Sequence, residues 1–163
     1  MNTLIVAWDD NRLIGSENKI PWKVKEDLKQ FRIRTADHAM VMGRKTWESL
    51  GSKPLIRREH VVVSKTLDWR AMPDHSVAHA NLVEAIEIAR LAVEDQKEVF
   101  IIGGAQIYKE AMEKDLVDKM IVSHIHGSHE GDVYFPEFDE SRWEVSLLSK
   151  HEEFDLYEYK RKL

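Results

Sequence analysis

Residues 99–108 read VFIIGGAQIY, an apolar run that meets two glycines and then continues into a segment we expect to be helical as far as about residue 113. Four consecutive apolar residues predict a strand that is buried on both faces. Gly103 and Gly104 predict a tight turn at its end. A buried strand followed at once by a helix is the repeating unit of an α/β protein.

The same alternation extends in both directions from this stretch. Strands are predicted at residues 3–8, 39–42, 60–64, 77–80 and 119–126, and helices at residues 23–34, 44–50 and 82–93. Residues 143–151 and 154–159 predict a closing antiparallel pair. We therefore expect a largely parallel sheet covered on both faces, with an antiparallel edge at its C-terminal end.

Length and composition favour one globular domain, residues 1–163. The chain has 24 Lys and Arg against 29 Asp and Glu, a net charge of −5, which disfavours nucleic acid as the main partner. It has no Cys, which excludes thiol catalysis and Cys-ligated metal sites. The start of the sequence shows no targeting signal, and no apolar stretch is long enough to span a membrane. We expect a cytoplasmic monomer.

Asp27 is the first candidate for chemistry. Helical spacing places it beside Val24, Leu28 and Phe31, on the face that should turn inward. A carboxylate there needs a hydrogen-bond donor, because uncompensated burial is costly. Two alternatives remain open: the backbone N–H groups of the helix start could satisfy it, or the missing partner could be a ligand.

A cationic segment of the chain is the second candidate. Residues 43–70 carry a net charge of +4, and the remaining chain carries −9. Arg44 and Lys45 open a helix, where positive charge opposes the helix dipole. With the Thr46 hydroxyl they could form a phosphate cradle, although a solvated loop would explain the same residues.

Other motifs are weaker. The glycine pair is only a fragment of a dinucleotide fingerprint. His124, His126 and His129 lack the context of a metal site, so no metal is predicted. Trp8, Trp47, Trp69 and Trp143 are interpreted as packing residues, whereas Trp22 stands directly before the Asp27 helix.

Taken together and in order, the motifs resemble the dihydrofolate reductase family over essentially the whole chain. The matching stretches are Ala7, Ile14-Gly15, Asn18, Pro21-Trp22, Asp27, Phe31, Met42–Ser49, Pro54-Leu55, Ile102–Gly104, Ile107-Tyr108, Gly131-Asp132 and Phe135-Pro136. The resemblance implies a mostly parallel eight-stranded sheet with an antiparallel C-terminal edge strand, flanked by about four helices. It also implies reduction of 7,8-dihydrofolate to tetrahydrofolate by NADPH, with hydride transfer to C6 and protonation at N5, and binding of antifolate-type molecules.

The resemblance carries a set of site residues. Asp27 and Trp22 would be catalytic. The substrate would contact Ala7, Asp27, Leu28, Phe31, Leu50, Arg58, Ile102 and Ser123. The cofactor would contact Ala7, Ile14, Gly15, Asn18, Gly43, Arg44, Lys45, Thr46, Ser64, Lys65, Gly103, Gly104, Ala105, Gln106 and Tyr108. The loop at residues 14–20 would close with Trp22 over the nicotinamide, and the Gly103-Gly104 peptide would be cis.

One region departs from the family pattern. The family commonly shows Leu-Pro-x-Arg-x-Asn, whereas this chain reads Leu55-Ile56-Arg57-Arg58-Glu59-His60. Arg58 is expected to bind the glutamate carboxylate of the substrate, and Arg57 is its rival. Two other functions stay open: a related NADPH-dependent reductase of a riboflavin-pathway pyrimidine, and a non-catalytic nucleotide-binding module.

Overall fold

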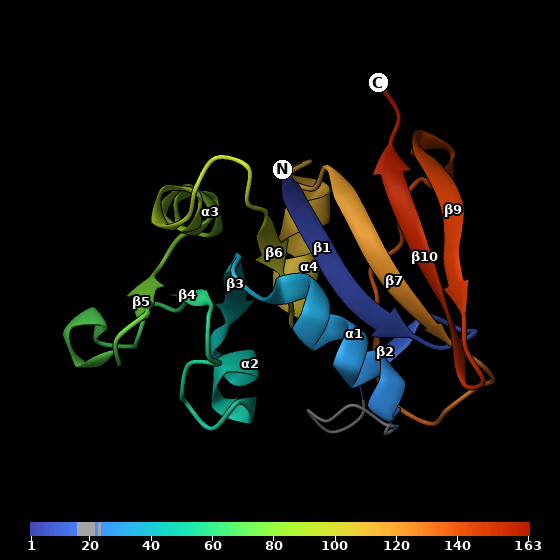
Figure 1. The fold of residues 1–163 in the computed structure, drawn as a ribbon, viewed down its shortest axis with the longest axis horizontal. Helices are drawn as coiled ribbons and strands as arrows, with labels where there is room; N and C mark the ends of the chain where they lie inside the picture. The colour runs from blue at the N-terminus through green and yellow to red at the C-terminus, as the bar shows by residue number, and fades with distance from the viewer. Residues whose placement is uncertain (16–21, 23) are drawn as a thin grey trace.

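An eight-stranded sheet runs through the middle of the protein, with helices on both of its faces (Figure 1). The computed structural model describes residues 1–15, 22 and 24–163. The strands of this sheet are β1 (Asn2–Trp8), β3 (Ala39–Gly43), β4 (Glu59–Val63), β5 (Ser76–His79), β6 (Val99–Ile101), β7 (Lys119–Ile125), β9 (Trp143–Lys150) and β10 (Phe154–Arg161). The α-helices are α1 (Lys25–Thr35), α2 (Arg44–Ser49), α3 (Leu82–Ala92) and α4 (Ala105–Glu113), and short 3-10 helices cover Trp69–Ala71 and Glu140–Arg142.

The strands lie in the order β5-β4-β3-β6-β1-β7-β10-β9. All pairs from β5 to β7 are parallel. Strand β10 pairs antiparallel with both β7 and β9. The predicted mostly parallel sheet with an antiparallel C-terminal edge is therefore confirmed.

Alternate residues of the central strands divide the core into two clusters. Leu4 and Val6 of β1 belong to the cluster that also holds the buried residues of α3 and α4. Ile5 between them belongs to the other cluster, with Val24 before α1 and Trp47 of α2. Since side chains alternate across a strand, the two clusters occupy opposite faces of the sheet, and helices cover both.

The carboxyl ends of the parallel strands meet at one edge of the sheet. Strand β3 ends at Gly43 and runs directly into α2, and β6 is followed by Gly103, Gly104 and α4. In parallel α/β sheets this edge is where ligands bind, because loops and helix N-termini converge there. The candidate residues carried by these strands are thus brought to one side of the molecule.

Three features differ from the sequence-based expectations. A two-stranded sheet pairs β2 (Leu13–Gly15) with β8 (Val133–Tyr134), two segments too short for periodicity to reveal. Leu28 is 47% exposed, because only part of the α1 stripe packs on the sheet. Trp69, interpreted from the sequence as a packing residue, is 62% exposed, and the Arg70 guanidinium lies 5.5 Å from its ring centroid.

Among the described residues, no helix is both long enough and apolar enough to cross a bilayer.

Candidate active site

Asp27 lies in the first turn of α1 and turns toward the sheet. The Ser123 hydroxyl of β7 donates a hydrogen bond to Oδ1 of Asp27. Burial raises the pKa of Asp27 above its usual range, and the Ser123 hydrogen bond opposes this only in part. Within the described part of the chain, no Lys or Arg contributes to that pKa. The carboxylate is therefore a desolvated charge with a neutral partner, not one satisfied by a cation.

Half-buried apolar side chains, which we call the apolar ledge, lie on the face of the sheet that α1 covers. Ala7 of β1 stands in register with Ser123 of β7. Several side chains on the same face of the sheet pack against the second core cluster without being fully covered: Ala7, Trp22, Phe31, Leu50, Leu55 and Ile102. The sequence-predicted substrate residues Ala7, Phe31, Leu50 and Ile102 are all among them. A flat apolar ring beside a single carboxylate fits such a surface.

Tyr108 of α4 ties the glycine turn to the sheet. Its hydroxyl lies 2.8 Å from the Ile5 carbonyl and 2.9 Å from the Ile102 carbonyl. Burial, followed by the negative charge of Asp27, raises the pKa of Tyr108, so the phenol stays protonated as a donor. A Cβ on Gly103, whose φ is +114°, would approach the Tyr108 ring within 3.1 Å. Glycine is required at this position, and the Gly103-Gly104 peptide is cis, as expected.

The ends of β3 and β6 form a second part of the site. The Gly43 N–H donates to the Gly103 carbonyl at 2.8 Å. A Cβ on Gly43 would lie 3.2 Å from Ile107, and one on Gly104 would lie 3.7 Å from the Thr46 hydroxyl. In the part of the chain that the structure describes, no side chain caps the start of α2 or of α4. Backbone N–H groups of Ala105 and Gln106 at the start of α4 therefore have no side-chain cap among the described residues.

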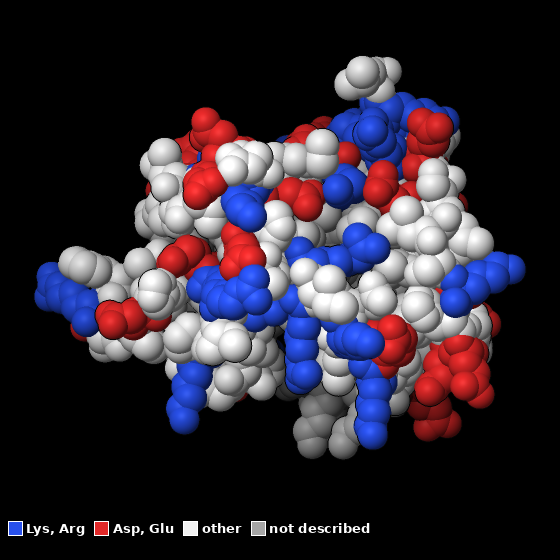
Figure 2. All heavy atoms as spheres, in the orientation of Figure 1, with Lys and Arg blue, Asp and Glu red and all other residues white. Residues whose placement is uncertain are grey.

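Cationic and hydroxyl side chains lie at the start of α2 and directly after β4, the strand that pairs with β3. Arg44 forms an ion pair with Glu48 at 3.1 Å and donates to the Thr66 hydroxyl at 3.2 Å. The Ser64 hydroxyl accepts from the backbone N–H of Thr66 at 3.2 Å. Lys45 and Lys65 are exposed. Figure 2 shows further Lys and Arg side chains gathered over the middle of one face, around α1.

The two candidate arginines for a substrate carboxylate have different surroundings. Arg57 is exposed and forms a two-point ion pair with Asp37. Arg58 is buried, and its guanidinium donates to the Thr35 hydroxyl at 2.9 Å and to the carbonyls of Ile56 and Arg32 at 2.7 Å each. All three acceptors are neutral. Burial lowers the pKa of Arg58, and the charges of Arg57 and Arg32 add to this effect.

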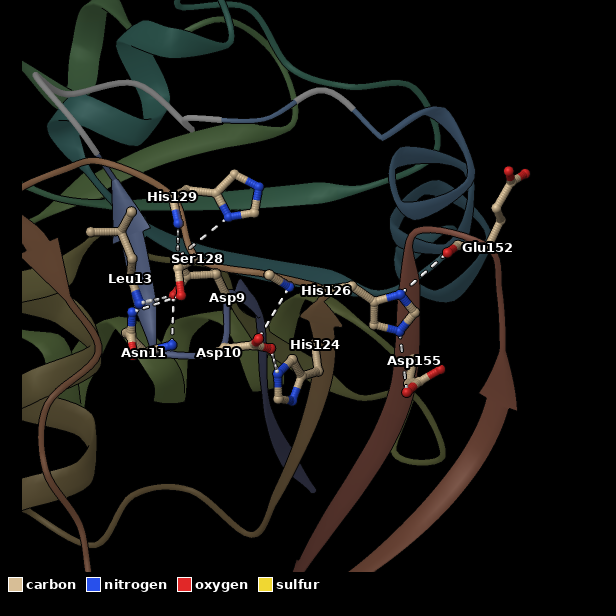
Figure 3. A network of polar contacts seen from close by, with 11 residues as sticks. Asp9, Asp10, Asn11, Leu13, His124, His126, Ser128, His129, Glu152 and Asp155 are labelled. Carbon is tan, nitrogen blue, oxygen red and sulfur yellow. Dashed lines mark hydrogen bonds and ion pairs between the residues drawn. The ribbon is translucent and has the colours of Figure 1, made fainter.

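A polar network joins the end of β1 to the loop after β7 (Figure 3). The fully buried Asp9 accepts from the backbone N–H groups of Asn11 and Leu13 at 2.9 Å each and of His129 at 2.7 Å. Its neighbour Asp10 is exposed; it contacts Nε2 of His124 at 2.7 Å and accepts from the Gly127 N–H at 3.2 Å. Two loops that are distant in sequence are thereby fixed together beside the site.

His129, in the loop after β7, also contacts Trp22, the predicted catalytic tryptophan. The ring centroids of Trp22 and His129 are 5.2 Å apart. The Asp132 N–H donates to the Gly15 carbonyl at 3.3 Å, next to Ile14 in β2. Asn18 and most of the loop predicted to close over the nicotinamide lie outside the described residues.

Sequence reasoning missed three residues of this region. Thr35, which accepts from Arg58, and His129, which contacts Trp22, give no local signal, because each acts on a side chain far away in sequence. Asp9 did have a usable sequence signal, since an acidic residue directly after an apolar strand is a candidate for a buried carboxylate. In the part of the chain that the structure describes, no three His or acidic side chains are grouped to hold a metal ion.

Comparison with known proteins adds independent information. A family model described as dihydrofolate reductase matches residues 1–162. The chain is 37% identical to a dihydrofolate reductase of Bacillus subtilis (strain 168) over 161 residues, covering 98% of this chain and 90% of that protein. It is 39% identical to a dihydrofolate reductase of Neisseria gonorrhoeae over 141 residues, covering 86% and 82%. Its structure is similar to that of a dihydrofolate reductase from Enterococcus faecalis complexed with NADP(H) and RAB-propyl, with a TM-score of 0.78, 31% identity and coverage of 99% and 96%.

Proposed function

The chain belongs to the dihydrofolate reductase family, and we propose that it reduces 7,8-dihydrofolate to 5,6,7,8-tetrahydrofolate with NADPH. The observation that carries this proposal is Asp27, a desolvated carboxylate with one neutral donor, set among half-buried apolar side chains. Its surroundings match a flat heterocycle that offers hydrogen-bond donors along one edge. The apolar ledge, with Ala7, Phe31, Leu50 and Ile102, takes the faces of the ring, and the exposed Leu28 adds to it from α1.

Asp27 holds the pteridine ring and prepares it for reduction. Its carboxylate accepts charge-assisted hydrogen bonds from the amidine-like edge of the ring. A negative charge at that edge favours protonation at N5, and the proton arrives from water. Once N5 is protonated, C6 becomes a better hydride acceptor. The N5–C6 double bond is reduced, and one proton and one hydride are consumed per turnover.

The chain's residues fit a dinucleotide phosphate cofactor. The supporting observations are the uncapped starts of α2 and α4, the side-chain-free backbone at Gly43, Gly103 and Gly104, and the cationic residues beside them. When bound, NADPH supplies the hydride. Gly43–Thr46 and Gly104–Gln106 hold its phosphates, and Ser64 and Lys65 face the 2′-phosphate and favour NADPH over NADH. Ala7, Ile14, Gly15 and Tyr108 border the nicotinamide, and Trp22 excludes water from it.

Arg58 binds the glutamate carboxylate of the substrate. Among the described residues, the buried Arg58 guanidinium hydrogen-bonds only to neutral acceptors, and a substrate carboxylate would supply the close negative partner that it lacks. Arg57 already has a carboxylate partner in Asp37, which argues against its candidacy. Antifolate-type molecules that carry the same ring edge would bind at Asp27 in the same way.

The remaining expectations are part of the proposal. We expect one domain over residues 1–163, a monomer in the cytoplasm, and no nucleic-acid partner. The net charge of −5 supports the last point.

The direct test is the loss of reduced-nicotinamide absorbance with and without dihydrofolate. We expect consumption of NADPH only with the substrate present. Asp27→Asn should slow turnover at least about 100-fold at neutral pH, with partial recovery at lower pH, where more substrate is already protonated. Consumption only with the riboflavin-pathway pyrimidine would favour the related reductase, and no turnover with either compound would favour a binding module.

A further inference from the structure

His60 stands at the start of β4, where the family pattern noted above has asparagine. Its side chain is almost fully buried, with 1% of the residue exposed. The edge of its ring meets Trp47 with centroids 5.8 Å apart. A buried imidazole in place of an amide brings a titratable group to a position where the pattern has none.

The hydrogen bonds of His60 define its protonation state. The Leu55 N–H donates to Nε2 of His60 at 3.0 Å. Nδ1 lies 3.2 Å from the His75 carbonyl, which also accepts from the His60 backbone N–H at 2.9 Å. A ring nitrogen that accepts carries no proton, whereas the nitrogen facing a carbonyl must carry one. Only the neutral ring protonated at Nδ1 satisfies both contacts.

These bonds hold the segment that leads to Arg58. Residues 54–58 are tied at Leu55 by the His60 ring and at Ile56 by the Arg58 guanidinium. The Leu55 side chain is half-buried against the second core cluster. At the other end of the segment, Arg57 is tied to Asp37. The position of the Leu55 end, which carries the Ile56 carbonyl that Arg58 contacts, therefore depends on the acceptor at Nε2.

We propose that neutral His60 is a positioning residue for the carboxylate tail of the substrate, and that its protonation weakens binding of that tail while leaving the reducing step intact. The inference rests on the proposed function, since it concerns the same substrate. Protonation at Nε2 sets an N–H against the Leu55 N–H. The bond from the Leu55 N–H is lost, the Leu55 end of the segment moves, and Arg58 is held less firmly for its contact with the carboxylate.

The surroundings of His60 set the pH range of the effect. Burial lowers the pKa of His60, whereas the carbonyls of His75 and Arg58 act to raise it. The charge of Arg58 lowers the pKa further, and that of Glu59 raises it. The His75 ring is exposed and pairs with Glu59 at 2.8 Å. The net direction is downward, so the effect is absent at neutral pH and develops below the ordinary imidazole pKa of about 6.5.

The test compares two substrates that share the reactive ring. The full-length protein is assayed with saturating NADPH from about pH 7.5 to about pH 5, a range in which the substrate carboxylates stay ionised. One substrate is 7,8-dihydrofolate, and the other is 7,8-dihydropteroate, which lacks the glutamate. Titration of Asp27 affects both, so it cancels in the ratio of their KM values. We expect the ratio of KM for dihydrofolate to KM for dihydropteroate to rise about fivefold in acid, the factor for one lost hydrogen bond, with an unchanged kcat ratio.

Matched variants separate positioning from folding. His60→Asn keeps an acceptor and a donor but does not titrate, so its KM ratio should equal that of the unmodified protein at neutral pH and stay flat in acid. His75→Asn leaves the His75 carbonyl in place and should keep the acid rise. As a spectroscopic check, ¹⁵N shifts of labelled histidine should show the His60 ring protonated at Nδ1 alone at neutral pH.

The outcomes are distinct. A flat KM ratio in the unmodified protein, an acid rise that persists in His60→Asn, or a His60 ring protonated at Nε2 at neutral pH would each overturn the inference, and none of them would touch the proposed function. Failure to reduce either substrate would instead contradict the proposed function. If His60→Asn fails to fold, the KM ratio and the ¹⁵N shifts of the unmodified protein still decide.

Discussion

Replacing the buried carboxylate at the end of β1, Asp9→Asn, should destabilise the protein by about 3 kcal/mol. One oxygen of Asp9 accepts two backbone N–H groups, and the other accepts the His129 N–H at 2.7 Å. Asparagine can supply only one oxygen. Its NH₂ group would face the N–H of His129, so a charge-assisted hydrogen bond worth about 1.5–3 kcal/mol is lost and a buried donor is left unpaired at a further cost of about 1–3 kcal/mol.

Asp10→Asn is the matched control. Asp10 is adjacent in sequence and contacts the same loop through Gly127 and His124, but 51% of its side chain is exposed. An exposed charge of this kind contributes at most about 1 kcal/mol. Urea unfolding followed by circular dichroism measures both losses. Equal losses for the two variants would refute the reasoning, because Asp9 is buried and accepts three backbone N–H groups, whereas Asp10 is exposed and accepts one.

The pH dependence of this loss has a definite sign. Burial by itself would raise the pKa of Asp9, but the N–H groups of Leu13, His129 and Asn11 hold it below its usual range. The charged form is thus favoured in the folded state. Its stabilisation is present above the unfolded pKa of about 3.9 and is lost as the pH falls through the folded value. The difference in the free energy of unfolding between Asp9→Asn and the unmodified protein should therefore become smaller below about pH 4.

Three further outcomes are expected. Because the pKa of Asp27 is raised in the folded protein, its charge lowers the free energy of unfolding above the unfolded pKa. Asp27→Asn should therefore stabilise the ligand-free protein at neutral pH by about 1 kcal/mol, or roughly 3 °C in Tm, and should give no gain near about pH 3. An unchanged Tm at neutral pH would show that the carboxylate is well solvated. A Cβ on Gly131 would lie 2.6 Å from the Gly15 carbonyl oxygen, so Gly131→Ala should cost about 1–3 kcal/mol in thermal unfolding, and an unchanged Tm would contradict this expectation. Tyr108→Phe removes a hydroxyl that bridges two carbonyls and should cost about 1–2 kcal/mol in urea unfolding, and a neutral result would mean that the hydroxyl adds nothing to the glycine turn.

The sheet could be predicted from the sequence because its strands are continuous apolar runs. The stretch from Val99 to Ile101 forms β6, and the glycines after it end the strand where expected. By contrast, β2 and β8 have three and two residues and are paired by the loops around them. Hydrophobic periodicity needs longer segments than these.

The sequence could predict those candidate residues whose pattern lies within a single helix or at the end of a single strand. Helical spacing singled out Asp27, and the cationic run singled out Arg44 and Lys45. Spacing did not predict that Leu28 would be exposed, since the stripe does not reveal how far a helix overhangs its sheet. Nor could it pair His60 with Leu55, because a five-residue separation in a loop has no fixed geometry.

The central position of β1 has a consequence for biosynthesis. This strand is near the start of the sequence, yet both of its neighbours, β6 and β7, come from beyond residue 98. A ribosome adding about 5–20 residues per second thus leaves β1 without partners for several seconds. Until the β9–β10 hairpin is also synthesised, β7 presents an open edge of the kind that recruits other chains. The nascent protein therefore keeps an unpaired strand edge until its last strands emerge, and a chaperone that covers this edge would protect it during synthesis.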